Sequence, residues 1–181
     1  MTRSRRALYV AAILFVLIAA DHLTKWVAIK QLRDTGQTYT FLGDFFRLVY
    51  AENAGAFLSL GAGLPPQARA AVMIGLNAVI LTGLLCYLFA AKHIHVLPAC
   101  ALTLIAGGGI GNLIDRVFRD GRVVDFMNMG IRVGDFQLRT GIFNIADIAI
   151  MAGLMLIIVN ELLGYRAKSK DSNSSSSPPA R

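Results

Sequence analysis

Long apolar segments separated by two polar stretches dominate the pattern of this chain. Four segments are almost wholly hydrophobic, and each approaches the ~20 residues that a helix needs to cross about 30 Å of hydrocarbon. They cover residues 7–29, 70–91, 96–114 and 142–163. The first begins like a signal peptide, but the apolar pattern resumes after Asp21 with "WVAIK", which indicates an uncleaved span. The pattern predicts an all-α integral membrane protein with four transmembrane helices.

The two long polar stretches between these spans differ in character. The stretch between the first and second spans contains "TYTFL" and "FFRLVY", rich in β-branched and aromatic residues, followed by the turn signal "ENAG". It predicts a small extracytoplasmic β-cradle between helices 1 and 2. The stretch at 115–141 holds four aspartates and five arginines. Residues 166–181 are low in complexity and predict a disordered cytoplasmic tail behind a single membrane-embedded domain, residues 1–165.

The composition supports a membrane protein. Of the 181 residues, 55% are hydrophobic and only 16% are charged. The net charge of +7 favours anionic lipid headgroups as neighbours, and no basic stripe interleaved with aromatic residues indicates nucleic-acid binding. An even number of spans puts both termini on one side. Because Arg3, Arg5 and Arg6 precede the first span, we expect cytoplasmic termini and both long polar stretches on the outer side.

Cysteine and histidine residues give no sign of a metal centre. Cys86 and Cys100 lie in apolar runs without CxxC spacing, and His22, His93 and His95 lack the helical spacing of metal ligands. We therefore expect neither a metal nor a cofactor.

Polar residues gather at the edges of the spans. Asp21 and Lys25 are four residues apart, so they share one helix face and are expected to form an ion pair. In the third span, Gly107 and Gly111 have the GxxxG spacing that lets a neighbouring helix approach closely.

The outer end of the third span carries Asn112, Asp115 and Arg116. Arg116 suits the negative end of the helix dipole, whereas Asp115 opposes it and needs a cationic partner. Either Arg116 or Lys25 could be that partner.

Two further aspartates lie in or near apolar sequence. If Asn144 caps the fourth helix, Asp147 is its third residue and can bond back to the cap amide. Asp125, within "VVDF", is flanked by apolar residues and is more readily explained as an aimed carboxylate than as a solvated one. Two neighbouring carboxylates share one proton, so one can deprotonate a water while the other protonates or polarises a carbonyl.

Five motifs in this order resemble the lipoprotein signal peptidases, also called signal peptidase II, over residues 8–165: "DHLTK", "NAGAF", "GGGIGNLIDR", "VVDF" and "FNIAD". The resemblance implies an aspartic endopeptidase of the bacterial inner membrane, and we expect the protein to be a monomer. Its partners would be membrane lipids and diacylglyceryl-modified prolipoproteins, which it cuts before the lipidated cysteine. The implied catalytic pair is Asp125 and Asp147. The implied support and substrate-binding residues are Asp21, Lys25, Asn53, Gly55, Asn112, Asp115, Arg116 and Asn144.

The chain departs from the family pattern at three places, and other functions stay open. His22 stands where glutamine is common, "NAGAFLSLG" is shorter than usual, and Ile148 follows Asp147 where a small or hydroxyl residue often occurs. One alternative is a serine–lysine signal peptidase using Ser59 and the desolvated Lys25. A second is a small proton or ion carrier that uses intramembrane acids.

Overall fold

Four long helices form the body of the computed structural model, which describes residues 3–55, 64–134 and 136–175. Each is long and apolar enough to cross a membrane, which confirms the four predicted spans. A short π-helical segment, η1 (Ile29–Arg33), extends the first helix. The helices are α1 (Arg3–Ala28), α2 (Pro66–Ala90), α3 (Val96–Phe118) and α4 (Ile145–Ser175).

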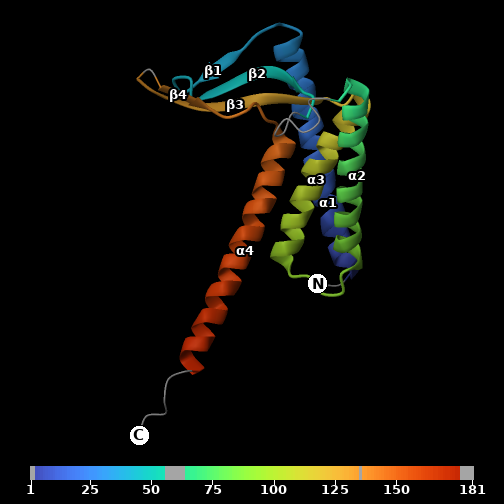
Figure 1. The fold of residues 1–181 in the computed structure, drawn as a ribbon, viewed down its shortest axis with the longest axis vertical. Coiled ribbons are helices and arrows are strands. Elements are labelled where there is room, and N and C mark those ends of the chain that lie inside the picture. Colours follow the sequence, from blue (N-terminus) through green and yellow to red (C-terminus); the bar gives the residue numbers. More distant parts are fainter. Residues whose placement is uncertain (1–2, 56–63, 135, 176–181) are drawn as a thin grey trace.

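Helix α3 is the centre of the bundle. In the described residues, 44% of its membrane-spanning window is buried, against 11–17% for the other spans. α1 and α2 lie beside α3, while α4 packs along α3 from the sheet end as far as Ala101, and its C-terminal part then runs away from the bundle (Figure 1). Most helices therefore expose apolar faces to lipid, and α3 holds the group together.

Glycines make this close packing of α3 possible. A Cβ atom on Gly107 would lie 2.8 Å from a Leu17 methyl group of α1, and one on Gly111 would lie 2.7 Å from the Asp21 carboxylate. On the α4 side, a Cβ on Gly108 would collide with the backbone carbonyl of Ala146. The GxxxG packing predicted from the sequence is confirmed, with α1 as the partner.

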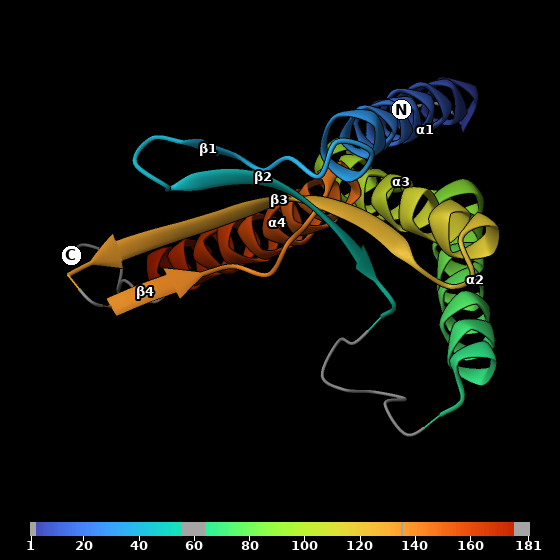
Figure 2. The same cartoon turned by 90° about the horizontal axis from the view of Figure 1, so that it is seen from above.

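A four-stranded antiparallel sheet caps one end of the bundle (Figures 1 and 2). Its strands lie in chain order, β1-β2-β3-β4. Their bounds are β1 (Tyr39–Phe41), β2 (Phe46–Asn53), β3 (Val123–Val133) and β4 (Phe136–Arg139).

The predicted β-cradle between helices 1 and 2 is confirmed but is only half of this sheet. β3 and β4 come from the connection between α3 and α4, where we predicted only a polar stretch. Asp125, Asn128 and Gly130 interrupt the apolar sequence of β3, so its strand character depends on pairing with the distant β2. Both polar stretches therefore build one surface over the bundle.

A small apolar core seats the sheet on the end of α1. Ala28 and Leu32 pack against Phe126 and Met127 of β3, and all four are buried. In the view from above, the sheet projects well to one side of α1 and α2 (Figure 2). The N-terminal half of β3, which contains Asp125, is thereby fixed against the end of α1.

The C-terminal segment differs from the predicted tail. Residues 166–181 were expected to be disordered, but α4 continues through Ser175 in the structure. No proline interrupts this segment before Pro178, so the backbone hydrogen bonds can continue past the span, which ends at Tyr165. Residues 176–181 lie outside the described residues, and the domain boundary at residue 165 stays a prediction.

Candidate active site

The chain segment before α4 is fastened to β3 beside Asp125. The backbone N–H groups of Phe126 and Met127 both donate to the carbonyl of Phe143, at 3.1 and 2.8 Å. The N–H of Phe143 donates in return to the carbonyl of Met127, at 2.8 Å. Asn144, the next residue along the chain, therefore lies next to Asp125.

An irregularity in the sheet lies at the same place. Leu48 of β2 pairs with Met127, but Ala51 pairs with Asp125, so β2 holds one extra residue between these two pairs. Such bulges are frequent beside active sites, where they redirect a side chain. Here the bulge lies directly before the pair that contains Asp125.

The start of α4 confirms the predicted capping box. The Asn144 side-chain oxygen accepts the N–H of Asp147 at 3.0 Å, and Asp147 Oδ2 accepts the N–H of Asn144 at 3.1 Å. The Asp147 carboxylate is thereby held in the first turn, at the positive end of the helix dipole.

The Asn144 side chain also links the two candidate catalytic residues. Its Nδ2 donates to Asp125 Oδ1 at 2.7 Å and lies 3.2 Å from the carbonyl of Val124. It is also 3.1 Å from Asn112 Oδ1, while Asn112 Nδ2 donates to Asp147 Oδ1 at 2.9 Å. Asn144 is completely buried. Asn144 thus contacts Asp125 through its side chain and holds Asp147 through the helix cap that it forms.

The environment of Asp125 shifts its proton affinity. The residue is 2% exposed, and this burial is the main reason that its pKa rises from 3.8 to about 6. The negative charge of Asp147 raises the pKa further, while hydrogen bonds from Asn53 and Asn144 lower it. A carboxyl group with this pKa can both hold and release a proton near neutral pH.

Lys25 forms the centre of a second cluster behind the aspartates. Its Nζ lies 2.7 Å from Asp21 Oδ2 and 2.9 Å from Asp115 Oδ2, and it donates to Asn112 Oδ1 at 3.1 Å. The ammonium group therefore has two carboxylate counter-ions and one hydrogen-bonded amide oxygen around it. The predicted Asp21–Lys25 pair is confirmed, and Lys25 is the cationic partner that Asp115 needs.

The two carboxylates bound to Lys25 also position the backbone beside the candidate aspartates. Asp21 Oδ1 accepts the N–H of Ala146 at 3.0 Å, and Asp115 Oδ2 accepts the N–H of Val124 at 3.2 Å. Ala146 and Val124 each directly precede one of the two candidate catalytic residues. Through these two carboxylates, Lys25 is linked to the backbone beside both candidate catalytic residues.

Sequence reasoning missed two neighbours of Asp115. Arg119 Nε lies 3.1 Å from Asp115 Oδ1, and His22 Nδ1 lies 3.9 Å from the same oxygen. The four-residue spacing from Asp115 to Arg119 was a signal for the first contact. His22 faces α3 across the helix interface, which the sequence does not reveal.

Arg116 lies between the aspartates and a polar cavity. It donates to the backbone carbonyl of Asn112 at 3.3 Å and interacts electrostatically with Asp125 and Asp147. The cavity, of about 870 Å³, is bordered by the end of β2, the start of α2 and the end of α3. Among the described residues, the buried Arg116 Nε has no hydrogen-bond partner.

Asn53 and Gly55 form the predicted turn after β2. The N–H of Gly55 donates to Asn53 Oδ1 at 2.9 Å, and Gly55 has a φ of +82°, which favours glycine. Asn53 thereby combines the turn with its hydrogen bond to Asp125. Ser59, the nucleophile of the serine–lysine alternative, lies outside the described residues.

No group of three or more histidine, cysteine, aspartate or glutamate side chains is placed to hold a metal ion in the described parts of the chain. The expectation of no cofactor stays a prediction. The buried carboxyl groups, amides and ammonium group can move a proton and orient a water without further groups.

Comparisons with known proteins agree with this arrangement. The family model described as signal peptidase (SPase) II matches residues 13–163. The lipoprotein signal peptidase of Borrelia turicatae is 33% identical over 87% of this chain and 90% of its own length. That of Chlorobium phaeovibrioides is 40% identical over 81% of this chain and 86% of its own length.

Solved structures show the same fold. A bacterial membrane enzyme determined at 1.9 Å by the in meso method superimposes with a TM-score of 0.69 and 27% identity, over 85% of this chain and 92% of the other. A second, at 2.3 Å, gives a TM-score of 0.67 and 25% identity, over 96% and 94%. The family expected from the sequence motifs is confirmed. With a family match across its helices and sheet, the chain belongs to the signal peptidase II family of aspartic peptidases and has lipoprotein signal peptidase activity.

Proposed function

We propose that Asp125 and Asp147 are the catalytic pair of this peptidase, and that they activate a water against the peptide bond before the lipidated cysteine of a diacylglyceryl-modified prolipoprotein. The observation that carries the proposal is the position of Asn144. Its side chain bonds to Asp125 at 2.7 Å, while its backbone N–H bonds to Asp147 at 3.1 Å. Two carboxyl groups from separate chain segments are thereby held by the side chain and the backbone of one buried asparagine.

The chemistry follows from a shared proton. The ionised member of the pair takes a proton from water, and the resulting hydroxide attacks the carbonyl carbon of the scissile peptide. The protonated member polarises the carbonyl oxygen during the attack. The leaving amine then takes a proton from the pair as the C–N bond breaks, so the pair returns to its starting charge. Because the two groups titrate together, we assign the acid and base roles to the pair.

Arg116 and the Asn112 amide are proposed to assist from either side. Asn112 holds Asp147 Oδ1 and is itself held by Lys25, so it fixes the carboxylate orientation. Arg116 lines the polar cavity with an unpaired buried Nε, and we assign it the binding of a substrate carbonyl. Asn53 would orient Asp125 from the opposite strand.

The lipid on the substrate has a physical role in this proposal. Two acyl chains hold the cysteine at the depth of the membrane surface, and the aspartates lie at that depth, between the ends of the helices and the sheet. The lipid therefore holds the scissile peptide bond close to the two aspartates, so the bond and the catalytic groups need not meet by free diffusion, and this favours the reaction.

We further propose an orientation in the bacterial inner membrane with cytoplasmic termini and the sheet on the outer face. The start of α1 and the far end of α4 lie at the same end of the bundle, away from the sheet (Figure 1). Arg3, Arg5 and Arg6 lie at that end, as expected for a cytoplasmic end. A monomer is sufficient, because every proposed site residue belongs to one chain.

The serine–lysine alternative fits the geometry poorly. The Lys25 ammonium group is completely buried and is enclosed by two carboxylates and one amide. A general base or nucleophile needs a free lone pair. The ion-carrier alternative requires acids along a path, yet the buried acids of the described residues gather at the sheet end.

Cleavage of a purified diacylated prolipoprotein tests the proposed pair. Asp125→Asn and Asp147→Asn should each lower the rate by about 10²–10⁴-fold or more, because each removes one half of the acid–base pair. Asp34→Asn, which changes an exposed aspartate beyond η1, is the matched control and should leave the rate unchanged. Turnover at the wild-type rate by either site variant would refute the pair.

A further inference from the structure

The polar cavity at the start of α2 and the end of α3 adjoins the two proposed catalytic residues. Its volume of about 870 Å³ is within the range typical of ligand sites in proteins. Ala54, which lines the cavity, directly follows Asn53, the residue that bonds to Asp125. Arg116, which also lines it, interacts electrostatically with both Asp125 and Asp147. A substrate cut by this pair therefore has the cavity directly beside it.

The lining of this cavity carries more positive than negative charge. Four arginines contribute to it, against the two acids Glu52 and Asp120. Arg122 is paired with Glu52, with Nη1 and Oε2 3.1 Å apart. Arg119 is paired with the buried Asp115, with Nε and Oδ1 also 3.1 Å apart. Two of the four arginines therefore have carboxylate partners already.

The other two arginines of the lining, Arg116 and Arg69, differ in their surroundings. Arg116 lies in the electrostatic field of the two aspartates. The half-buried Arg69 guanidinium has neither a hydrogen bond nor an ion pair with any residue that the structure describes, Asp120 included. The sequence from residue 53 to residue 114 contains no acid at all. Arg69 is therefore the arginine of this cavity whose charge is available to a ligand.

We propose that this cavity binds the first residues after the lipidated cysteine of the substrate, and that Arg69 selects an acidic side chain among them. The inference rests on the proposed cleavage by Asp125 and Asp147. The signal peptide and the acyl chains stay in the membrane, so the chain after the cysteine has to leave toward water. The cavity lies where α2 begins and α3 ends, at the sheet end of the bundle. An arginine there can bond both oxygens of a carboxylate and repels a basic side chain.

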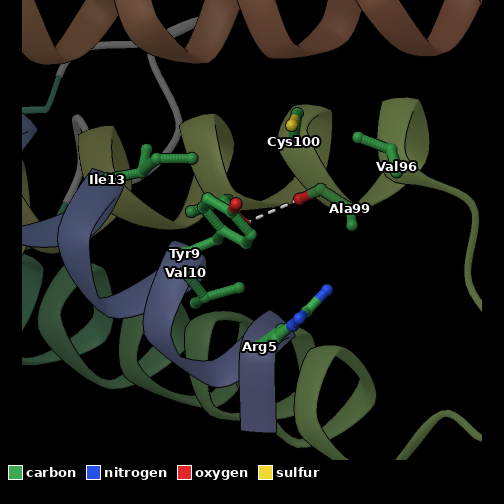
Figure 3. A pocket seen from close by; sticks show the side chains of 8 residues that line it. Arg5, Tyr9, Val10, Ile13, Val96, Ala99 and Cys100 are labelled. Carbon is green, nitrogen blue, oxygen red and sulfur yellow. Dashed lines mark hydrogen bonds between the residues drawn. The ribbon is translucent and has the colours of Figure 1, made fainter. Parts of the chain in front are cut away.

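The groove between α1 and α3, shown in Figure 3, has the opposite character. Most of its lining side chains are apolar, such as Val10 and Val96. Its lining extends only to Ile13 along α1 and to Thr103 along α3, at least two helical turns short of Asp21 and Asn112. That groove suits neither the polarity nor the position of the chain that follows the cysteine.

A lipid phosphate is the competing occupant of the polar cavity. An unpaired arginine would attract a phosphate as well as a carboxylate. A resident lipid beside Asp125 and Asp147, however, would stand in the path of the substrate chain. The position of the cavity therefore favours the peptide.

Competition between two diacylated substrates tests the selectivity of the full-length protein. The substrates differ only in the residue directly after the cysteine, which is aspartate in one and lysine in the other. The wild-type protein should cleave the aspartate substrate with a kcat/KM about fivefold higher, the ratio expected for one partly exposed ion pair. Equal values would overturn the inference and leave the catalytic pair untouched, because both substrates would still be cut. Loss of all cleavage in Asp125→Asn tests the pair separately.

Charge variants assign the selectivity to Arg69. Arg69→Gln should reduce the fivefold preference to less than about twofold, and Arg69→Glu should reverse it in favour of lysine. Arg132→Gln, which removes an exposed arginine on the sheet, is the matched control and should keep the full preference. A preference that survives in Arg69→Glu would overturn the role of Arg69.

Added phosphatidylglycerol distinguishes the competing occupant. If the wild-type protein cuts both substrates equally, and Arg69→Gln changes cleavage of both only when phosphatidylglycerol is present, the cavity holds a lipid phosphate and the proposal is wrong. If Arg69→Gln does not fold, the preference of the wild-type protein still decides, since it should shrink as added salt screens the ion pair. A preference that does not respond to salt would contradict recognition by charge.

Discussion

The two ends of the helix bundle each bury a cation, and they do so in different ways. At the end away from the sheet, the guanidinium of Arg6 donates to the carbonyls of Phe89 and Ala91, at 3.1 and 2.7 Å. These carbonyls belong to the last turn of α2 and its cap, where helix geometry leaves carbonyls without partners. At the sheet end, Lys25 is bound by three side chains from two helices.

This difference between Arg6 and Lys25 indicates the role of the buried charges at the sheet end. Arg6 completes the end of a neighbouring helix, and its side-chain hydrogen bonds within the described part of the chain go to those two carbonyls alone. The carboxylates that bind Lys25 continue instead to the backbone of Ala146 and Val124, beside the two proposed catalytic residues. A buried network costs desolvation energy at every member. We infer that this cost is retained because the network sets the geometry of the active site.

Removal of the Lys25 charge should have the largest effect. Lys25→Met leaves the buried Asp21 carboxylate without a counter-ion and leaves Asp115 with only the partly exposed Arg119, so it should lower the free energy of unfolding by about 3–5 kcal/mol. The measurement is an unfolding titration in mixed detergent micelles. The triple variant Asp21→Asn, Lys25→Met, Asp115→Asn removes all three charges and should recover most of that loss. A loss of stability below about 1 kcal/mol in the single variant would show that the buried carboxylates do not need the Lys25 charge.

Asp125→Asn should have the next largest effect, and in the opposite direction. The folded protein binds the Asp125 proton with a pKa of about 6, against 3.8 ordinarily, so ionisation above pH 6 destabilises the folded state. Asparagine cannot ionise and keeps an oxygen for the Asn144 bond. The variant should gain about 2–3 kcal/mol at pH 8, and the gain should vanish as the pH falls from about 6 to 4. A pH-independent difference would contradict the burial of an ionised carboxylate here.

Arg6→Leu should have the smallest effect and sharpens the comparison between the ends. It leaves two carbonyls at the end of α2 to water, and the loss should be about 1–2 kcal/mol in the same unfolding titration. Cleavage of diacylated substrate by the folded variant should stay at the wild-type rate. A large loss of turnover would mean that this end also acts on the site.

Local patterns in the sequence predicted the parts of this structure that depend on local interactions. Spans of about 20 apolar residues have few alternatives to a membrane helix. The cap formed by Asn144 and Asp147 involves residues three apart, and so its geometry follows once the start of α4 is known. The Asp21–Lys25 pair was predictable for the same reason.

Contacts between distant segments could not be predicted in the same way. The strand character of β3 depends on its pairing with β2, which lies about 75 residues earlier in the chain. Asn53 of β2 pairs with Val123 of β3, and Phe46 pairs with Met129. The bond from Asp21 to the Ala146 N–H joins residues 125 apart and requires the close approach that the α3 glycines allow. The motif order suggested that the polar residues belong together, but the central place of the Asn144 amide is visible only in three dimensions.

The claim that Asp125 and Asp147 act as one proton-sharing pair is tested most directly by an infrared titration of the carboxylic-acid C=O band. In the wild-type protein we expect a band at pH 5 that is lost with a midpoint near pH 6, in keeping with the raised pKa of Asp125. Asp125→Asn should lack this titration. Asp147→Asn should shift the midpoint to lower pH, because the neighbouring negative charge is gone while the burial remains. An unchanged midpoint in Asp147→Asn would show that the two carboxyl groups do not interact, and would contradict the pair.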